Sequence, residues 1–161
     1  MNKENFLEEI LTRRRTRVAE ERAACDPHAL RRQAERVREA KAPHRLRSAL
    51  TKNGGIKIMG EFKRASPSRG VIRDDADLAK MVALYEAAGV CAVSILTEPD
   101  VFRGSLEDLR QARAVTELPI LRKDFIVVEY QIDEAVVAGA DAVLLIVAAL
   151  ADRELLHLRT A

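Results

Sequence analysis

Three segments of the sequence place charged or hydroxyl side chains directly after apolar runs, where an enzyme site could form. The first begins at Glu61, near the end of the apolar run 56–62. In an extended strand, Glu61 and Lys63 point to the same face, whereas Phe62 points to the other. The two charged groups can pair there, the ammonium can bind an anionic substrate, and Ser66 can donate a hydrogen bond to a carboxylate. The alternative interpretation is a surface ion pair followed by an ordinary Ser-Pro turn.

The other two segments supply an aromatic ring and a second lysine. Residues 96–104 form a polar loop that ends at Gly104, and Phe102 within it could cover a ring-containing ligand or fold back onto the protein. Lys123 closely follows the apolar residues 119–121. Desolvation at such a position lowers the pKa of a lysine and makes it a usable general acid near neutral pH. A solvated lysine at the end of a strand is the alternative.

The elements that must position these residues alternate regularly from residue 56 onward. Apolar runs predict strands over 56–62, 90–96, from 119 and over 142–147, and amphipathic segments predict helices over 74–88, from 105, over 129–138 and from 152. This order predicts a parallel sheet covered by helices. Since active sites in such folds gather at the carboxyl ends of the strands, all three segments should lie at one edge.

An internal repeat favours a barrel over a doubly wound sheet. The string Ala88–Val93 resembles Ala138–Val143, 50 residues later, which is the length of two strand–helix units. No strand is followed by a Gly-x-Gly-x-x-Gly or Walker-type loop, so the nucleotide-binding alternatives lack their motif. Helical patterns also cover 5–24 and 28–41, with one more turn near 46–50. The predicted domains are therefore an N-terminal helical extension over 1–50 and a sheet domain over 51–161.

Composition and charge exclude several classes of function. The net charge of +2 argues against general nucleic-acid binding, and no apolar run reaches the length of a membrane span. Cys25 and Cys91 lie in unlike contexts, so neither a disulfide framework nor a zinc site is expected, and Cys91 is predicted to be a small buried hydrophobe. The N-terminus has no apolar signal core, so we expect a cytoplasmic protein. The arginine runs near the N-terminus are predicted to be solvated helix faces, with a basic binding patch as the minority interpretation.

Taken together, the motifs resemble the indole-3-glycerol-phosphate synthase family. The resemblance runs from about residue 5 to 161, and the strings that carry it are Glu61–Ser68, Val93–Pro99, Phe102–Ser105, Leu121–Ile126, Tyr130–Ile132 and Gly139–Ile146. It implies an α/β fold, a (β/α)8 TIM barrel, of which this sequence would hold about the first four βα units behind the helical extension. It also implies a lyase of tryptophan biosynthesis that needs no metal or organic cofactor.

The resemblance further implies a role for each candidate site residue. The family's reaction closes the pyrrole ring of 1-(2-carboxyphenylamino)-1-deoxyribulose 5-phosphate with loss of carbon dioxide and water. By resemblance, Lys123 is the general acid, Lys63 binds the anionic substrate and assists the dehydration, and Glu61 lies beside it. Ser66 would contact the substrate carboxylate, and the pocket for the aromatic ring would be lined by Phe102, Phe125 and Leu144. These residue types suit the chemistry, because attack on a carbonyl builds charge on oxygen and needs a positioned acid.

Two departures from the family pattern stand out. The sequence stops after the expected fourth helix, whereas the family's second half supplies a catalytic carboxylate base and phosphate-binding loops. Our hypothesis is therefore a truncated product or fragment that is inactive alone, with the first and fourth strands as open edges through which it could self-associate. The smaller departure is Leu46, where the family usually has an aromatic residue.

Two other functions remain open at this stage. A non-catalytic half-barrel could self-associate into a structural or ligand-binding dimer. Another barrel enzyme acting on a phosphosugar, such as a phosphoribosyl isomerase, is the third hypothesis. The Lys-Asp-Phe string from Lys123 and the helical extension argue against the isomerase.

Overall fold

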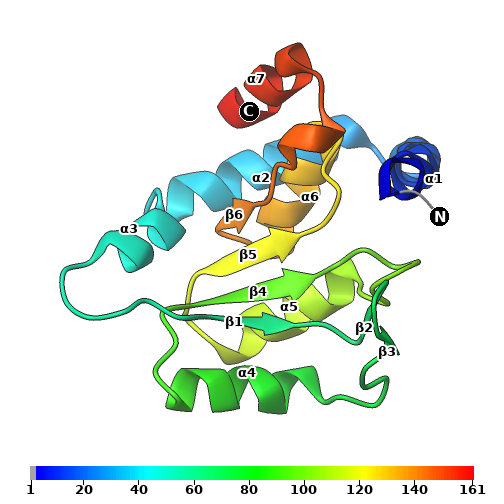
Figure 1. The fold of residues 1–161 in the computed structure, drawn as a ribbon. Helices are drawn as coiled ribbons and strands as arrows, with labels where there is room; N and C mark the ends of the chain where they lie inside the picture. The colour runs from blue at the N-terminus through cyan, green and yellow to red at the C-terminus, as the bar shows by residue number, and fades with distance from the viewer. Residues whose placement is uncertain (1–2) are drawn as a thin grey trace.

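The computed structural model describes residues 3–161 as a parallel sheet with helices packed around it (Figure 1). Its elements are α1 (Lys3–Ala23), α2 (Pro27–Ala40), α3 (Arg45–Thr51), β1 (Met59–Phe62), β2 (Ala65–Ser66), β3 (Gly70–Val71), α4 (Leu78–Ala87), β4 (Ala92–Leu96), α5 (Leu106–Val115), β5 (Ile120–Lys123), α6 (Tyr130–Val137), β6 (Ala142–Val143), the short 3₁₀ turn η1 (Val147–Ala149) and α7 (Asp152–Thr160). The predicted alternation of strands and helices is confirmed. The N-terminal helices precede the first strand, and the predicted division into two domains stays a prediction.

Four strands form one parallel sheet in the order β1-β4-β5-β6, and β2 and β3 form a small antiparallel pair. β1 and β6 are the edges of the four-stranded sheet, so the first and fourth predicted strands are unpaired on one side. In Figure 1, α1 lies on the side toward which the strand arrows point, and α3 lies at the opposite end.

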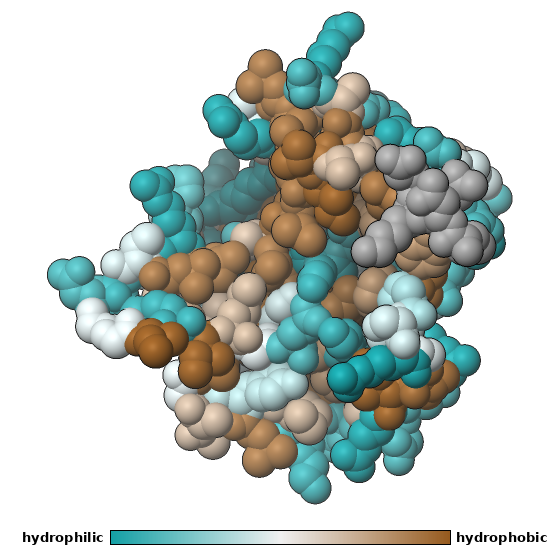
Figure 2. Space-filling view, in the orientation of Figure 1, coloured by the Kyte–Doolittle hydropathy of each residue, from teal (hydrophilic) through white to brown (hydrophobic). Residues whose placement is uncertain are grey.

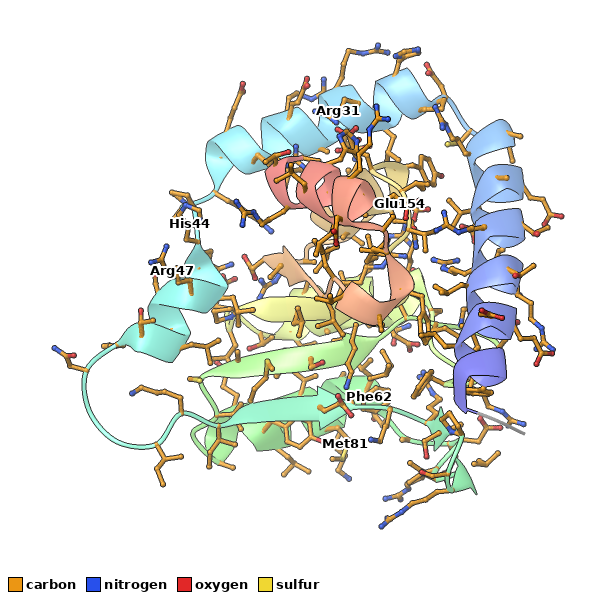
Figure 3. The ribbon with its side chains drawn as sticks, turned by 45° about the horizontal axis from the view of Figure 1, so that its top comes forward. Arg31, His44, Arg47, Phe62, Met81 and Glu154 are labelled. Atoms are coloured by element: carbon orange, nitrogen blue, oxygen red, sulfur yellow. The ribbon has the colours of Figure 1, made fainter. Side chains whose placement is uncertain are left out.

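The main core lies between the outer face of the sheet and the helices α4, α5 and α6. Its buried members are Phe62, Leu78, Val82, Val93, Ile95, Leu109, Ala112, Ile120, Ala135, Ala138 and Ala140. Figure 3 shows Phe62 and Met81 close together, where β1 packs on α4. A smaller cluster joins Ile126, Ile132 and Leu158 of the C-terminal part. The alternate strand residues, including Glu61 and Lys123, therefore face the other side of the sheet.

Capping residues explain where several helices begin and end. Ser105 Oγ accepts the Asp108 backbone N–H at 3.1 Å at the start of α5, the helix predicted from residue 105. Asp26 caps α2 through the His28 backbone N–H at 2.9 Å, with Pro27 in the first turn. After α6, Gly139 adopts a φ of 101°, a left-handed conformation that glycine adopts without steric cost.

Asp141 fixes the amino end of the sheet. Its Oδ2 accepts the Ile120 backbone N–H at 2.9 Å and Arg113 Nη1 at 3.1 Å, while its Oδ1 accepts Arg45 Nη1 at 2.8 Å. One carboxylate thus ties β5 to the start of β6, to α5 and to α3. This ties α3, in the N-terminal helical region, to the sheet.

Several predicted element boundaries were wrong because apolar residues continue beyond the paired strands. The strand predicted over 56–62 begins at Met59, and Ile56 is 92% exposed. The strand predicted over 142–147 ends at Val143, and Val147 starts η1. The helix predicted over 74–88 begins only after its cap, Asp77.

Two burial predictions were also wrong. Cys91 is only partly buried, because it precedes β4 at the open amino end and its Sγ lies against the Ile58 carbonyl. The arginine runs are not uniformly solvated, because Arg14 is buried. Hydrophobic side chains are instead open to solvent near η1 and α7, as Figure 2 shows, including Val147 and Leu156.

Candidate active site

The structure brings Glu61, Lys63 and Lys123 together at the carboxyl end of the sheet. Lys63 Nζ lies 2.9 Å from Glu61 Oε1, and Lys123 Nζ donates a hydrogen bond to the other carboxylate oxygen, Oε2. Because β4 separates β1 from β5, the Lys123 side chain must cross β4 to reach Glu61. Ser94 of β4 is in register with Glu61, and its small side chain leaves room for that crossing.

The three groups form a partly open site with an excess of positive charge. The Glu61 side chain is 28% exposed, and the side chains of Lys63 and Lys123 are each 37% exposed. Burial alone would raise the pKa of Glu61, but hydrogen bonds from Lys123 and Lys63 outweigh burial and hold that pKa below its ordinary value. Glu61 is therefore ionised near neutral pH and faces two ammonium groups. The remaining positive charge suits an anionic ligand.

The other predicted site residues lie on the loops at this end of the sheet. Ser66 of β2 is buried, with its Oγ 3.5 Å from the Oγ of Ser68. Phe102 and Phe125 are half-buried residues of the loops after β4 and β5. Leu144 follows β6 and donates its backbone N–H to the Arg122 carbonyl at 3.1 Å. No hydrogen bond among residues 3–161 joins these four residues to the Glu61–Lys63–Lys123 group.

Glu98 shapes the loop that carries Phe102, a role that the sequence did not predict. It is 2% exposed, and its carboxylate accepts the backbone N–H groups of Asp100 at 3.0 Å, Val101 at 2.7 Å and Phe102 at 3.0 Å. Three such bonds satisfy a buried carboxylate and fix the turn. The sequence shows a glutamate directly before Pro99, but it does not show that Glu98 is buried.

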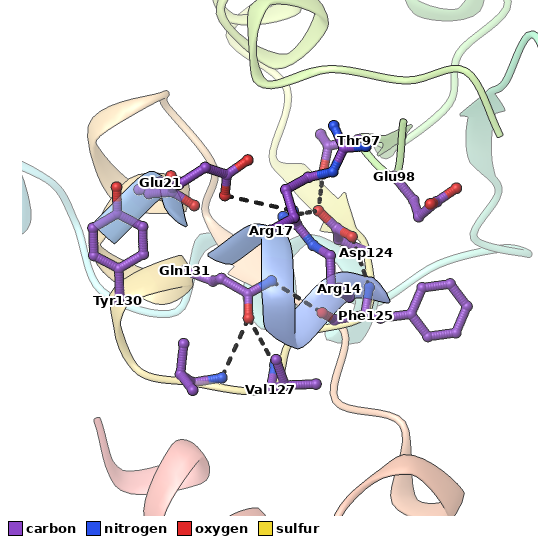
Figure 4. Close-up of polar contacts among 12 residues, drawn as sticks. Arg14, Arg17, Glu21, Thr97, Glu98, Asp124, Phe125, Val127, Tyr130 and Gln131 are labelled. Carbon is purple, nitrogen blue, oxygen red and sulfur yellow. Dashed lines mark hydrogen bonds and ion pairs between the residues drawn. The ribbon is translucent and has the colours of Figure 1, made fainter. Parts of the chain in front are cut away.

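A buried ionic cluster on the opposite face of β5 was also missed (Figure 4). Asp124 Oδ2 accepts Arg14 Nη2 at 3.0 Å, Arg122 Nη2 at 3.0 Å and Thr97 Oγ1 at 2.7 Å. Asp124 and Arg122 have fully buried side chains. Alternation along the strand gave the only sequence signal, since Arg122 stands at a position whose neighbours 120 and 124 also face the helices.

Two structural features were sought in the part of the chain that the structure describes, a cluster of metal-ligating side chains and a membrane-spanning helix. No group of three or more His, Cys, Asp or Glu side chains in residues 3–161 is arranged to hold a metal ion. Within the same residues, no helix combines the length and apolar character needed to cross a bilayer.

The positions of the charged side chains at one end of a parallel sheet indicate the class of protein. A parallel α/β sheet with charged groups at the carboxyl ends of its strands is the arrangement of barrel enzymes whose sites form from βα loops. The family model for indole-3-glycerol phosphate synthase matches residues 7–161. The chain therefore belongs to the indole-3-glycerol phosphate synthase family, and its α/β architecture is that of a partial (β/α)8 barrel.

Similar proteins carry the same family name. The chain is 45% identical over 153 residues to the indole-3-glycerol phosphate synthase of Carboxydothermus hydrogenoformans, covering 93% of this chain and 58% of that protein. It is 46% identical over 150 residues to that of Mycolicibacterium gilvum, covering 93% and 54% respectively. The relative from Micrococcus luteus is 52% identical over 126 residues, covering 76% of this chain and 47% of the relative. The chain thus spans about half the length of these curated relatives.

Proposed function

We propose that this chain carries the part of an indole-3-glycerol phosphate synthase site that binds the anionic substrate and protonates its carbonyl. The substrate is 1-(2-carboxyphenylamino)-1-deoxyribulose 5-phosphate. The observation that carries the proposal is the meeting of Lys63 and Lys123 on the two oxygens of Glu61. A site with one carboxylate and two ammonium groups can bind a carboxylate or phosphate and still donate a proton.

Lys123 is the general acid in this proposal. The ring carbon that bears the carboxylate attacks the ketone carbon, and Lys123 donates a proton to the ketone oxygen as the new carbon–carbon bond forms. Loss of carbon dioxide restores the aromatic ring. The hydroxyl group made from the ketone then leaves as water while the adjacent ring carbon loses a proton, which forms the new ring double bond, and Lys63 assists that step. Glu61 holds both ammonium groups in place.

The remaining predicted contacts complete the substrate site. Ser66 binds the substrate carboxylate, and Phe102, Phe125 and Leu144 enclose the aromatic ring in an apolar slot. A further base and the phosphate-binding loops would come from the part of the relatives that this chain does not match. We therefore expect the 161-residue chain alone to bind the substrate weakly and to turn it over far more slowly than the Carboxydothermus relative. A cytoplasmic location also remains a proposal.

The test measures substrate binding and product formation separately. We expect binding to the 161-residue chain, followed through the fluorescence of the anthranilate ring, to weaken about tenfold in Lys63→Met, which corresponds to about 1.4 kcal/mol. Arg13→Met is the matched control, because Arg13 is an exposed residue that pairs with Glu9 of its own helix. Binding that is equal in the two variants would refute the assigned site.

The role of Lys123 is tested on product formation. The 161-residue chain is mixed with the segment of the Carboxydothermus relative that the match does not cover, and indole-glycerol phosphate is measured. We expect the Lys123→Met chain to lose at least about a hundredfold in rate, the lower range of general acid catalysis. A mixture in which both chains form product equally fast would remove Lys123 from the reaction.

The open sheet edges favour self-association as a second candidate function. β1 and β6 have unpaired edges, and Met59 of β1 is 38% exposed. Unpaired strand edges pair readily with another chain. Sedimentation analysis of the 161-residue chain would detect a dimer. A monomer at all concentrations would exclude this candidate and leave the enzymatic proposal untouched.

A further inference from the structure

Helix α1 buries an arginine in the middle of its apolar stripe. Ile10 and Val18 are 4% and 3% exposed, and Arg14, midway between them, is 5% exposed. Residues four apart lie on one face of a helix, so Arg14 occupies a position where the pattern calls for an aliphatic side chain. Burying a guanidinium costs free energy unless it is paired, so its partner explains why it can be there.

That partner is Asp124, at the end of the strand that carries Lys123. Arg14 Nη2 binds Asp124 Oδ2 at 3.0 Å, and Arg14 Nη1 lies 3.6 Å from Glu21 Oε2 on its own helix. The side chain of Asp124 is completely buried. Figure 4 shows Arg14 reaching from α1 toward Asp124, next to Thr97. The contact therefore joins the N-terminal helix to the carboxyl end of β5.

Asp124 and its neighbour Thr97 hold the backbone that directly follows the Lys123 side chain. Asp124 Oδ1 accepts the Phe125 N–H at 2.8 Å, and the Lys123 carbonyl accepts the Thr97 N–H at 3.0 Å. Thr97 Oγ1 also donates to Asp124 Oδ2 at 2.7 Å. The direction in which the Lys123 side chain leaves the strand is thus set by a peptide segment whose anchor is the Asp124 carboxylate.

Arg14 is not needed to neutralise that anchor. Arg122 Nη2 already binds the same oxygen of Asp124 at 3.0 Å, and Arg122 lies within the sheet itself. Burying a second cation costs desolvation free energy, which offsets much of its attraction to Asp124. We therefore look for the role of Arg14 in the position that it gives Asp124, not in a gain in stability. Two further arginines of α1 reach other parts of the chain: Arg17 binds Asp100 of the loop after β4 at 2.6 Å, and Arg15 lies 3.3 Å from Glu154 of α7.

We propose that Arg14 is a positioning residue that, through Asp124, holds Lys123 against Glu61. The N-terminal helix then belongs to the machinery that orients the acid, rather than acting only as a cover for the core. This inference rests on the proposed function for the role of Lys123, but its structural content can be measured without turnover.

The test compares the chemical reactivity of two lysines in the full 161-residue chain. Lys63 and Lys123 bind the same carboxylate and have equal exposure, 37%, but only Lys123 adjoins Asp124. Brief acetylation with a trace of acetic anhydride at about pH 8.5, below the ordinary pKa of lysine, followed by peptide mass spectrometry, gives the ratio of Lys123 to Lys63 labelling. The ratio removes effects that loosen the whole site equally.

We expect Arg14→Met to raise this ratio about threefold or more, because a lysine released from its carboxylate is a freer nucleophile. Arg14→Lys, which keeps the charge on α1, should return the ratio toward the wild-type value. Arg13→Met, one residue away and solvent-exposed, is the matched control and should leave the ratio unchanged. Circular dichroism establishes that each variant is folded.

An unchanged ratio in folded Arg14→Met would overturn the proposal, and so would an equal rise in the labelling of both lysines. If the Met variant does not fold, Arg14→Gln, which keeps a hydrogen-bond donor and removes the charge, is tested with the same two outcomes. A chain that fails to bind the substrate but shows the expected ratio would contradict the proposed function alone. A chain that binds substrate with an unchanged ratio would contradict only the role of Arg14.

Discussion

The two faces of β5 carry ionic groups that differ in their exposure to solvent. Lys123 points to the open face and meets Glu61 and Lys63, all of which remain partly exposed. Its neighbours Arg122 and Asp124 point to the other face, where their side chains are 0% exposed. Three consecutive charged residues are thus divided between a site that a ligand can reach and a cluster that no solvent reaches.

This difference in exposure shows how charged residues at one strand end can serve both ligand binding and structural support. Partly exposed groups keep their ability to exchange protons and bind anions, and their mutual attraction contributes little to stability. Buried groups gain directional hydrogen bonds but require every partner to be present. The buried cluster is therefore suited to hold the backbone in place, and the partly exposed group of Glu61, Lys63 and Lys123 is suited to bind a ligand and exchange protons.

Removing charge from each face of β5 is the strongest test of this comparison. We expect Asp124→Ala to lower the free energy of unfolding by about 3–5 kcal/mol, because Arg122 and Arg14 would remain buried without it. Lys123→Ala should lower it by less than about 1 kcal/mol, because its ion pair is partly exposed. Urea unfolding followed by circular dichroism measures both. Equal losses in the two variants would show that the faces do not differ in this way.

Lys41, a buried cation outside the cluster, tests whether ion pairing offsets the free-energy cost of burying a charge. The Nζ of Lys41 is buried without a hydrogen-bond partner among the described residues, and burial lowers the pKa of Lys41. We expect Lys41→Met to stabilise the protein at neutral pH by roughly 0.5–1 kcal/mol, since the side chain as a whole is only partly buried. Thermal unfolding at pH 7 measures the gain.

The pH dependence of the same variant provides a control. The unfolded chain binds more protons than the folded chain between the lowered pKa of Lys41 and the ordinary lysine value of about 10.4, so the wild-type contribution to stability rises with pH across that window. The advantage of Lys41→Met should shrink as the pH approaches 10. An advantage that is independent of pH would point to packing rather than charge.

The smallest expected effect is the acid sensitivity of the open group. Burial opposes the lysine hydrogen bonds at Glu61, but the net effect lowers its pKa, so its ionised form contributes stability above its unfolded pKa of about 4.3. That contribution is lost as the pH falls through the lower, folded pKa. We expect the difference in unfolding free energy between wild type and Glu61→Gln to fall by less than about 1 kcal/mol on acidification. Denaturation series at several pH values would measure it, and a difference that grows toward acid would have the wrong sign.

Much of the fold was predictable because it follows local periodicity. Alternation placed Phe62 and Glu61 on opposite faces of the first strand, and Phe62 lies in the core. The helix predicted over 129–138 is followed directly by Gly139, with its left-handed φ. The predicted strand boundaries were wrong where apolar residues have no neighbouring strand to pair with. Ile56 is a residue type that is common in strands, yet it is exposed because strand pairing starts only at Met59.

The residue types of the candidate site could be predicted from the sequence, but the buried contacts that hold them in place could not. The spacing of Glu61 and Lys63 and the position of Lys123 after an apolar run are local features. The link between Arg14 and Asp124 spans 110 residues. The spacing from Ile10 and Val18 places Arg14 on their face of the helix, but nothing near Arg14 in the sequence indicates that Asp124 is its partner. Which carboxylate that face of α1 meets depends on how α1 packs on the sheet, and only the assembled fold sets that packing.

The chain alone indicates the order of strands and helices, the family, and the residue types able to bind an anion and donate a proton. Periodicity and motif spacing are properties of neighbouring residues, which the chain states directly. The folded arrangement is needed to show that two lysines share one carboxylate across an intervening strand, and that Arg14 is buried against Asp124. Both are distances between segments far apart in the chain, and packing of the whole sheet and its helices fixes them.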